Sequence, residues 1–112
     1  MKKPTISYLD FQKLDIRAGE IKEASHLEGS RNLLQLKVDL GEDYGVVEIL
    51  AGIANEYKPK DIVGEKFPFL ANLEPKKMLG KYSNGMIFAV DVKGKAILFP
   101  LKKKVPVGST IR

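Results

Sequence analysis

Short stretches of alternating hydrophobic and polar residues run along the chain, which is the pattern of half-buried β-strands. The clearest covers residues 34–40, where every second side chain is Leu or Val. A Gly-Glu-Asp-Tyr-Gly turn follows, and alternation over residues 47–51 predicts the second strand of a hairpin. Residues 14–24 alternate with a change of phase at Gly19, which predicts a bulge or bend in a strand that curls around a small barrel.

The second half of the chain has shorter apolar runs and more turn residues. Residues 52–59 predict one or two turns of helix that end before Pro59, because a residue that precedes proline disfavours helical geometry. Pro68 lies inside an apolar run and predicts an edge strand or a bulge. The remaining predicted elements are strands over 65–72, 86–92 and 96–101, turns at 61–64 and 93–94, an irregular segment over 73–85 and a short extended tail over 105–112.

Short strands joined in sequence by tight turns favour an all-β barrel, since closure removes the exposed edges of a sheet. The predicted helix between the third and fourth strands fits a five-stranded barrel of the OB type with extra C-terminal strands. A chain of 112 residues, 44% of them hydrophobic, fits one domain over residues 1–112 with a substantial core.

Composition and motifs exclude most catalytic chemistry. The chain has no Cys, which excludes disulfides, thiolate metal sites and cysteine nucleophiles. His26 is the only histidine and we expect it to be an exposed loop residue, while Asp15 and Glu48 are expected to be solvated. Since no glycine-rich phosphate loop is present either, we predict a binding protein, neither an enzyme nor a protein with a metal or cofactor.

The location of the protein is predicted from what the sequence lacks. No apolar leader follows the two N-terminal lysines, and no stretch approaches the roughly 20 apolar residues of a membrane span. A small secreted domain usually needs disulfides, and this chain has none. We therefore expect a cytoplasmic protein that does not contact a membrane.

Positive charge is concentrated in the second half of the chain. Residues 1–56 contain 7 Lys and Arg against 10 Asp and Glu, a net charge of −3. Residues 57–112 contain 12 against 4, a net charge of +8. This asymmetry indicates an anionic partner, although lysines that only keep a small barrel soluble would give the same pattern.

Two groups of polar residues are candidates for contact with such a partner, because they combine cations with amides, hydroxyls and apolar surface. The alternative is that the lysines are ordinary loop residues and that Met86 belongs to the core. The chain has few aromatic residues, and Phe67, Phe69, Phe88 and Phe99 are expected in the core, so recognition of a folded RNA is favoured over stacking along a single strand. The first group is Arg31, Asn32, Gln35 and Lys37, and the second is Lys76, Lys77, Lys81, Tyr82, Ser83, Asn84 and Met86.

Five ordered motifs resemble the tRNA-binding domain family, which includes the C-terminal domain or beta subunit of methionyl-tRNA synthetases, free-standing tRNA-binding proteins, the endothelial monocyte-activating polypeptide domain and the CsaA-type chaperone. The resemblance implies an OB barrel that binds tRNA through its folded shape, largely without sequence preference. The motifs are FQKLDIRAGEI (11–21), LLQLKVDLG (33–41), AGIANEYKPKDIVGEKF (51–67), ANLEPKKMLGKYSNGMIFA (71–89) and VPVGSTIR (105–112).

The resemblance also implies roles for individual residues. It implies phosphate contacts from Arg31, Lys37, Lys76, Lys77 and Lys81, with Arg17 as a further RNA-facing residue or a structural one. Asn32, Ser83 and Asn84 would hydrogen-bond riboses or base edges, and Met86 would pack against a sugar or base. Free-standing members are homodimers, and the corresponding contact here would use Tyr8, Leu9, Phe11, Leu98, Phe99, Leu101, Val105, Val107 and Ile111.

Three functions within this family remain open from the sequence. The first is a dimeric tRNA-binding protein, which the Ser-Asn-Gly-Met pattern at 83–86 favours. The second is a CsaA-like chaperone that binds unfolded or exported polypeptides in the same groove. The third is a docking subunit for methionyl-tRNA synthetase.

Overall fold

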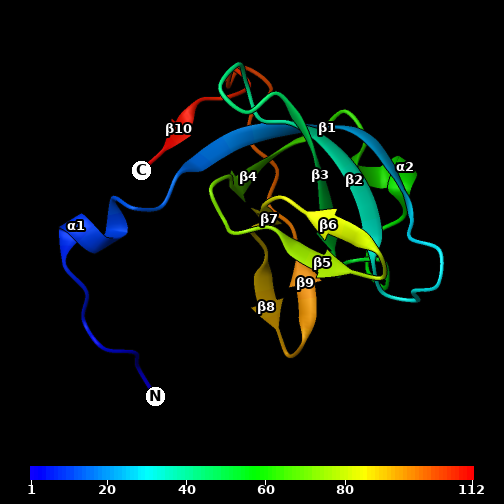
Figure 1. Cartoon of the computed structure of the whole chain (residues 1–112), viewed down its shortest axis with the longest axis horizontal. Helices are drawn as coiled ribbons and strands as arrows, with labels where there is room; N and C mark the ends of the chain where they lie inside the picture. Colours follow the sequence, from blue (N-terminus) through cyan, green and yellow to red (C-terminus); the bar gives the residue numbers. More distant parts are fainter.

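Three consecutive strands form one wall of a barrel in the computed structural model, which describes residues 1–112 (Figure 1). Strand β1 (Ile16–His26) pairs antiparallel with β2 (Leu34–Asp39), and β2 pairs antiparallel with β3 (Val46–Ala51). Alternation in β2 is as predicted, because Leu34, Leu36 and Val38 are buried while Lys37 is exposed. These residues confirm that the pattern marks one face toward the core and one toward solvent.

The barrel continues on the other side of β1 and almost closes. Strand β4 (Lys66–Leu70) pairs with β1, and the short β7 (Met86–Ile87) pairs with β4, which gives the strand order β3-β2-β1-β4-β7. β7 also packs against β3, at the seam of the barrel. The core inside this sheet is built around fully buried side chains, among them Phe69 and Ile21. This architecture confirms the predicted all-β, OB-like barrel.

Gly19 has a different role from the one that its sequence context predicts. Its backbone pairs regularly with Phe67, and the register of β1 shifts only later, between Ile21 and Glu23. A Cβ at Gly19 would lie 2.6 Å from Cδ1 of Phe69, closer than side chains approach one another. The glycine is therefore needed for close packing of the core, and the bulge lies a few residues further along the strand.

The helices are short, and the predicted position of the second was wrong. Helix α1 (Tyr8–Phe11) precedes the barrel, and α2 (Pro59–Ile62) lies between β3 and β4. The helix begins at Pro59, whereas we expected it to end there, because proline has no N–H to lose in the first turn and its φ is already helical. The Asp61 carboxylate accepts a hydrogen bond from the Lys58 N–H at 3.0 Å and caps this end.

One hairpin was not predicted, and the strands of a second are shorter than predicted. The expected irregular segment contains β5 (Lys76–Met78) and β6 (Lys81–Ser83), and the expected strand over 86–92 is interrupted between β7 and β8 (Val90–Val92). Strand β9 (Lys95–Ile97) returns beside β8. The Lys93-Gly94 turn between them is confirmed, with φ values of 53° and 84° that suit a tight hairpin.

The C-terminal segment is attached to the start of β1. Strand β10 (Thr110–Ile111) pairs with β1, and the Gly108 N–H donates to the Ala18 carbonyl at 2.8 Å. A Cβ at Gly41 would lie 2.7 Å from Cα of Gly108, so the two backbones meet where only glycine fits. Neither helix of the protein has the length and apolar character needed to cross a membrane.

Candidate nucleic-acid interface

The hairpin formed by β5 and β6 packs against β3 and carries three of the predicted cations (Figure 1). Lys77 pairs with Tyr82, and Lys76 pairs with Ser83. Directly opposed residues share one face of a hairpin, so Lys77 and Tyr82 lie on the face opposite to that of Ser83. The Lys77 ammonium lies 5.9 Å from the centre of the exposed Tyr82 ring, within the range of a cation–π contact.

The lysines of this hairpin form no ion pair. The salt bridges of the protein all lie within residues 10–43, and none involves Lys76, Lys77 or Lys81. All three side chains are exposed. Their charge is therefore available to a polyanion without the loss of an internal contact.

The loop between β1 and β2 meets the tip of this hairpin. A Cβ at Gly29 in the loop would lie 4.0 Å from Cδ1 of Leu79 at the hairpin tip. The same loop presents Arg31, which is exposed and forms no ion pair, and Asn32, whose Oδ1 accepts a weak hydrogen bond from Asn55 at 3.3 Å. The structure thus places the loop that carries Arg31 and Asn32 close to the tip of the β5–β6 hairpin.

The outer face of β2 continues this surface but is partly neutralised. The Lys37 ammonium is exposed and lies 4.0 Å from the Glu23 carboxylate, a loose pair that an anion would displace readily. Gln35 is less available, because its Nε2 donates to Glu48 at 2.6 Å. Glu48 is accordingly half-buried and hydrogen-bonded, which corrects the expectation that its carboxylate is solvated.

Ser83 and Asn84 close the barrel. The Ser83 hydroxyl, in a residue only 5% exposed, accepts from the Leu50 N–H at 3.0 Å and donates to the Gly85 carbonyl at 3.1 Å. The Asn84 backbone N–H and Nδ2 both donate to the Glu48 carbonyl, at 2.8 and 3.2 Å. The Ser83 hydroxyl is therefore not free for RNA, contrary to expectation, whereas Asn84 keeps its Oδ1 without a partner in the chain.

Met86 lies at the edge of the barrel and is not a core residue. Its side chain is 44% exposed, while the next residue, Ile87, is buried and belongs to the core cluster. The chain thus changes from surface to core within two residues. A flexible thioether side chain at this position can pack against an irregular partner surface.

Leu79 is a surface residue of the hairpin that the sequence interpretation missed. It is 60% exposed at the tip and has a φ of +50°, a left-handed conformation that few non-glycine residues adopt. The signal in the sequence was the Leu-Gly pair between lysines, which marks a turn. An apolar side chain among these cations adds contact area to the same surface.

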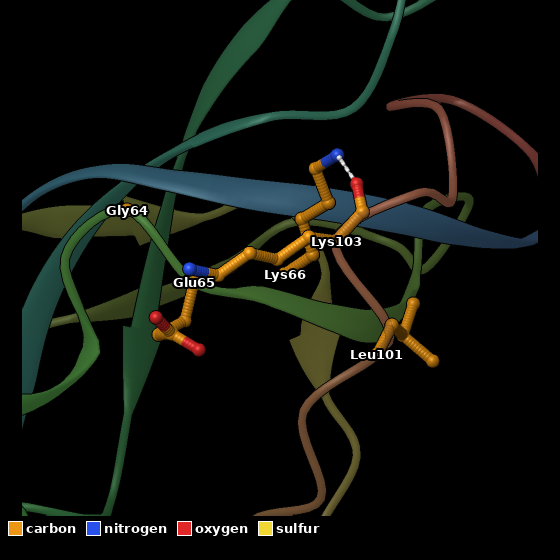
Figure 2. A pocket seen from close by; sticks show the side chains of 5 residues that line it. All are labelled: Gly64, Glu65, Lys66, Leu101 and Lys103. Carbon is orange, nitrogen blue, oxygen red and sulfur yellow. Dashed lines mark hydrogen bonds between the residues drawn. The ribbon is translucent and has the colours of Figure 1, made fainter.

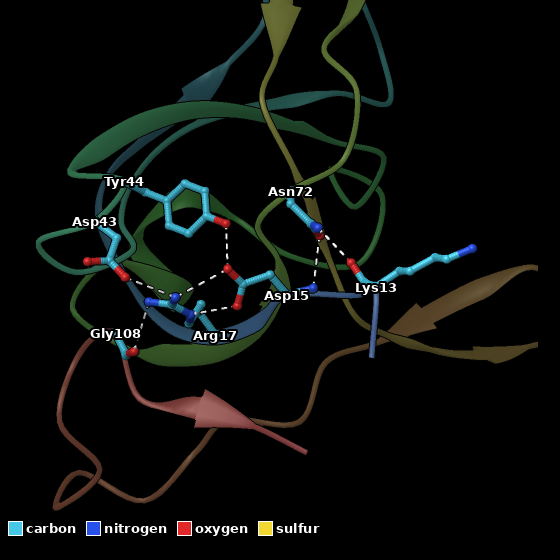
Figure 3. A network of polar contacts seen from close by, with 7 residues as sticks. All are labelled: Lys13, Asp15, Arg17, Asp43, Tyr44, Asn72 and Gly108. Carbon is cyan, nitrogen blue, oxygen red and sulfur yellow. Dashed lines mark hydrogen bonds and ion pairs between the residues drawn. The ribbon is translucent and has the colours of Figure 1, made fainter. Parts of the chain in front are cut away.

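Arg17 is engaged in a network within the chain (Figure 3). Its guanidinium donates to Asp15 at 2.7 and 3.2 Å and to Asp43 at 3.0 Å, and it lies 5.3 Å from the centre of the Tyr44 ring. A longer contact of 3.4 Å reaches the Gly108 carbonyl in the C-terminal segment. These contacts give Arg17 a structural role, and its prediction as an RNA-facing residue gains no support.

The same network shifts the pKa values of its members. Burial alone would raise the pKa of Asp15, but hydrogen bonds from Arg17 and Tyr44 outweigh it and hold that pKa below the ordinary value. The hydrogen bond to Asp15, together with burial, raises the pKa of Tyr44. Hydrogen bonds to Asp15 and Asp43 raise the pKa of Arg17. Asp15 is thus an internal partner of two side chains, which corrects the expectation that it is solvated.

The residues predicted for dimer contact are half-buried or exposed, with one exception. Tyr8 and Leu9 are 70% and 73% exposed on α1, and Phe99 is 43% exposed, although we also expected Phe99 in the core. Phe88 is half-buried and lines a shallow apolar groove of about 180 Å³. Leu98 is the exception, because it belongs to the core. The groove is lined by Ile16, Pro68, Phe88, Phe99 and Ile111.

Comparisons with known proteins find similarity over almost the whole chain. Residues 16–110 match the family model described as "Putative tRNA binding domain". The chain is 45% identical over 111 residues to a methionine–tRNA ligase of Methanothrix thermoacetophila, a match that spans 99% of this chain and 16% of that relative's length. A solved structure of a MetRS related protein from Pyrococcus horikoshii superposes with a TM-score of 0.92 at 32% identity, covering 98% of this chain and 100% of that one. The chaperone CsaA from Bacillus anthracis superposes with a TM-score of 0.85 at 26% identity, covering 97% and 100%.

Proposed function

The chain belongs to the tRNA-binding domain family, and on that premise we propose that it binds folded tRNA through the surface formed by the β5–β6 hairpin, the β1–β2 loop and the outer face of β2. The observation that carries this proposal is the set of unpaired hairpin lysines beside an exposed loop. A polyanion that binds at the hairpin lysines releases its counterions without breaking an internal ion pair.

Each class of side chain on this surface suits a different part of an RNA. Lys76, Lys77 and Lys81 contact phosphates, and Arg31 and Lys37 extend the same track along the barrel. Asn32 and the free Oδ1 of Asn84 are placed to meet ribose hydroxyls or base edges. Tyr82 and Met86 supply apolar surface for a sugar or an unstacked base. We leave Ser83 and Arg17 out of this interface because their polar groups are already engaged.

Recognition by shape follows from the kind of groups present. Lysine and asparagine side chains that contact the phosphates and riboses of an RNA respond to the spacing of its backbone. Only one exposed aromatic ring lies on this surface, which is too few for stacking along a single strand. The interaction is therefore largely independent of sequence and depends on the folded form of the tRNA.

The test compares a folded tRNA with an unstructured RNA of equal length in a binding titration. Tighter binding of the folded tRNA, with affinity that falls steeply as salt is raised, is the expected result. Equal affinity for the two RNAs would contradict recognition by shape.

We assign the chain as a cytoplasmic binding module and not as an enzyme. The ligase named among its relatives is about six times longer, so that activity is a property of the whole relative. Association with a methionyl-tRNA synthetase is part of the proposal, because a separate tRNA-binding module would raise the local concentration of tRNA near its enzyme. Co-purification with a synthetase that lacks such a module tests this.

A second copy of the chain is the proposed occupant of the apolar groove beside α1. Phe99 and Ile111 line the groove, and Ile111 also lines a second pocket together with Tyr8 and Phe11 of α1. A symmetric dimer would cover this surface on both copies and would place two hairpins on one assembly. Two binding surfaces on one rigid body suit the extended shape of a tRNA.

Binding of unfolded polypeptide is the second candidate function. The observations that favour it are the apolar groove and the likeness to CsaA, a chaperone by name. An assay of aggregation suppression, with and without tRNA as competitor, separates the two functions. Suppression that tRNA does not affect would place polypeptide binding at the groove, away from the hairpin.

A further inference from the structure

A second group of lysines lies outside the β5–β6 hairpin, around the start of β4. A pocket of about 290 Å³ lies beside the start of β4 and is open to solvent (Figure 2). Its lining residues all lie outside the β5–β6 hairpin, the β1–β2 loop and β2, so this pocket is separate from the proposed tRNA surface. Its lining is Gly64, Glu65, Lys66, Leu101 and Lys103.

Lys66 supplies a fixed positive charge at this pocket. Its ammonium donates to the carbonyls of Lys103 and Val105 at 2.9 and 2.7 Å, and it has no carboxylate partner. An ammonium has three protons, so one remains for a further acceptor. A cation that is held in place by neutral carbonyls keeps its full charge and loses little entropy when an anion binds.

The turn over residues 102–105 adds further donors. It is closed by a hydrogen bond of 3.0 Å from the Val105 N–H to the Lys102 carbonyl, while the N–H groups of residues 102–104 donate to no group in the chain. Lys102, Lys103 and Lys104 are exposed and form no ion pair. Figure 2 shows the Lys103 side chain extending back across the pocket toward Glu65.

One acidic residue distinguishes this pocket from a simple patch of cations. Glu65 is half-buried at the rim, and its carboxylate is neither ion-paired nor hydrogen-bonded within the chain. A carboxylate repels a bare phosphate but accepts hydrogen bonds from hydroxyl groups. Ammonium groups that can hold a phosphate and a carboxylate that can accept from a hydroxyl thus line one pocket, and together they fit a ribose phosphate.

We propose that the pocket beside Lys66 and Lys103 binds a ribose phosphate unit of RNA, with the phosphate on the ammonium groups and a ribose hydroxyl on Glu65. The identity of the RNA as tRNA rests on the proposed function, whereas the chemistry of the pocket does not. Binding here gives the protein a second RNA contact, separate from the hairpin.

The first test is an amide NMR titration with adenosine monophosphate, deoxyadenosine monophosphate and inorganic phosphate. Saturable shifts at Gly64, Glu65 and Lys103 are expected, strongest for the ribonucleotide. Lys103→Ala weakens binding about tenfold, while Lys95→Ala, which removes the same charge from the β8–β9 hairpin, leaves it unchanged. Shifts spread evenly over all exposed lysines, or none at the pocket, would overturn the proposal.

Glu65→Ala, which removes both the negative charge and the hydrogen-bond acceptor, tests the role of the carboxylate. The variant binds inorganic phosphate more tightly, because a repulsive charge is gone, and loses its preference for the ribonucleotide over the deoxyribonucleotide. An unchanged preference would overturn the assignment of the ribose hydroxyl to Glu65.

The second test separates the RNA backbone from a free nucleotide as the source of the ligand. Lys103→Ala lowers the slope of tRNA affinity against salt by about 1, and this loss adds to that of hairpin variants. Lys103→Ala could weaken monophosphate binding and yet leave the slope of tRNA affinity against salt unchanged. That result would overturn the RNA contact and show that the pocket binds free nucleotides only. If Lys103→Ala lowers the slope of tRNA affinity against salt and substitutions in the β5–β6 hairpin do not, the proposed function is contradicted and the pocket is not.

Discussion

Ser83 hydrogen-bonds to the edge of β3, where a further strand would otherwise pair. Its hydroxyl accepts a hydrogen bond from the buried Leu50 N–H, and the Asn84 side chain donates one to the Glu48 carbonyl. An unpaired backbone group inside a barrel is costly, so these two side chains contribute to the fold before any ligand is present. The residue that remains open to a partner in this motif is Met86.

Ser83→Ala is expected to reduce the free energy of unfolding by about 1–3 kcal/mol, because it leaves the Leu50 N–H without its acceptor. The tRNA affinity of the folded variant should not change. Urea denaturation and a binding titration measure the two effects, with exposed Ser25→Ala as the matched control. A variant as stable as the wild type that binds tRNA more weakly would place Ser83 in the interface instead.

Asp15 is expected to make stability depend on pH in the acid range. Hydrogen bonds from Arg17 and Tyr44 hold its pKa below that of the unfolded chain, so the stabilisation is present at neutral pH and is lost as pH falls below about 4. Asp15→Asn should flatten this part of the unfolding profile, measured by denaturation at successive pH values. Glu74→Gln, at an exposed residue without a partner, should leave the profile as it is.

At the scale of elements, the sequence predicted those strands whose burial alternates regularly. Strands β2 and β3 lie where the alternation of Leu and Val indicated. The β5–β6 hairpin escaped notice because only Ser83 and half-buried Met78 are shielded from solvent, while Lys76 and Lys81 on the same face are exposed, so no apolar period marks it. Helix α2 was misplaced because a proline can begin a helix as well as end one.

The candidate site was predictable in composition but not in detail. The cations of the hairpin and loop were found from charge and resemblance, and the structure places them together. Sequence could not show that Ser83 and Arg17 are already engaged, since those contacts join residues far apart in the chain. The same holds for Lys66, whose carbonyl partners lie 37 and 39 residues away.

The two glycines around β6 should differ in their tolerance of alanine. A Cβ at Gly85 would lie 2.8 Å from the Leu70 carbonyl oxygen, whereas a Cβ at Gly80 would meet nothing within 4 Å. Both have positive φ, so Gly80→Ala costs only the backbone strain of about 1–2 kcal/mol. Gly85→Ala should cost at least about 2 kcal/mol more, from the clash. Equal losses in thermal or urea denaturation would mean that the seam of the barrel relaxes freely.

At the scale of the whole molecule, charged and apolar surfaces are segregated. The hairpin lysines lie on one wall of the barrel, and the apolar groove lies where β10 and the segment around Phe99 meet the start of β1. A polyanion and a second copy of the chain can therefore bind at the same time. This arrangement allows dimerisation and RNA binding to be tested by separate substitutions.

Phe99→Glu is expected to convert a dimer into a monomer, because it places a charge in the apolar groove. Sedimentation velocity measures the change. Val46→Glu, at another exposed apolar residue that lies outside the groove, is the matched control and should leave the dimer intact. A wild-type protein that sediments as a monomer at micromolar concentration would contradict the proposed dimer.

The dependence of tRNA affinity on salt concentration tests the central claim most directly. The measurement compares wild type with Lys76→Ala/Lys77→Ala and with Lys93→Ala/Lys95→Ala, which removes equal charge from the other hairpin. The account predicts a slope smaller by about 2 for the β5–β6 variant and an unchanged slope for the control. Equal reductions in both variants, or none in either, would contradict binding through the β5–β6 hairpin.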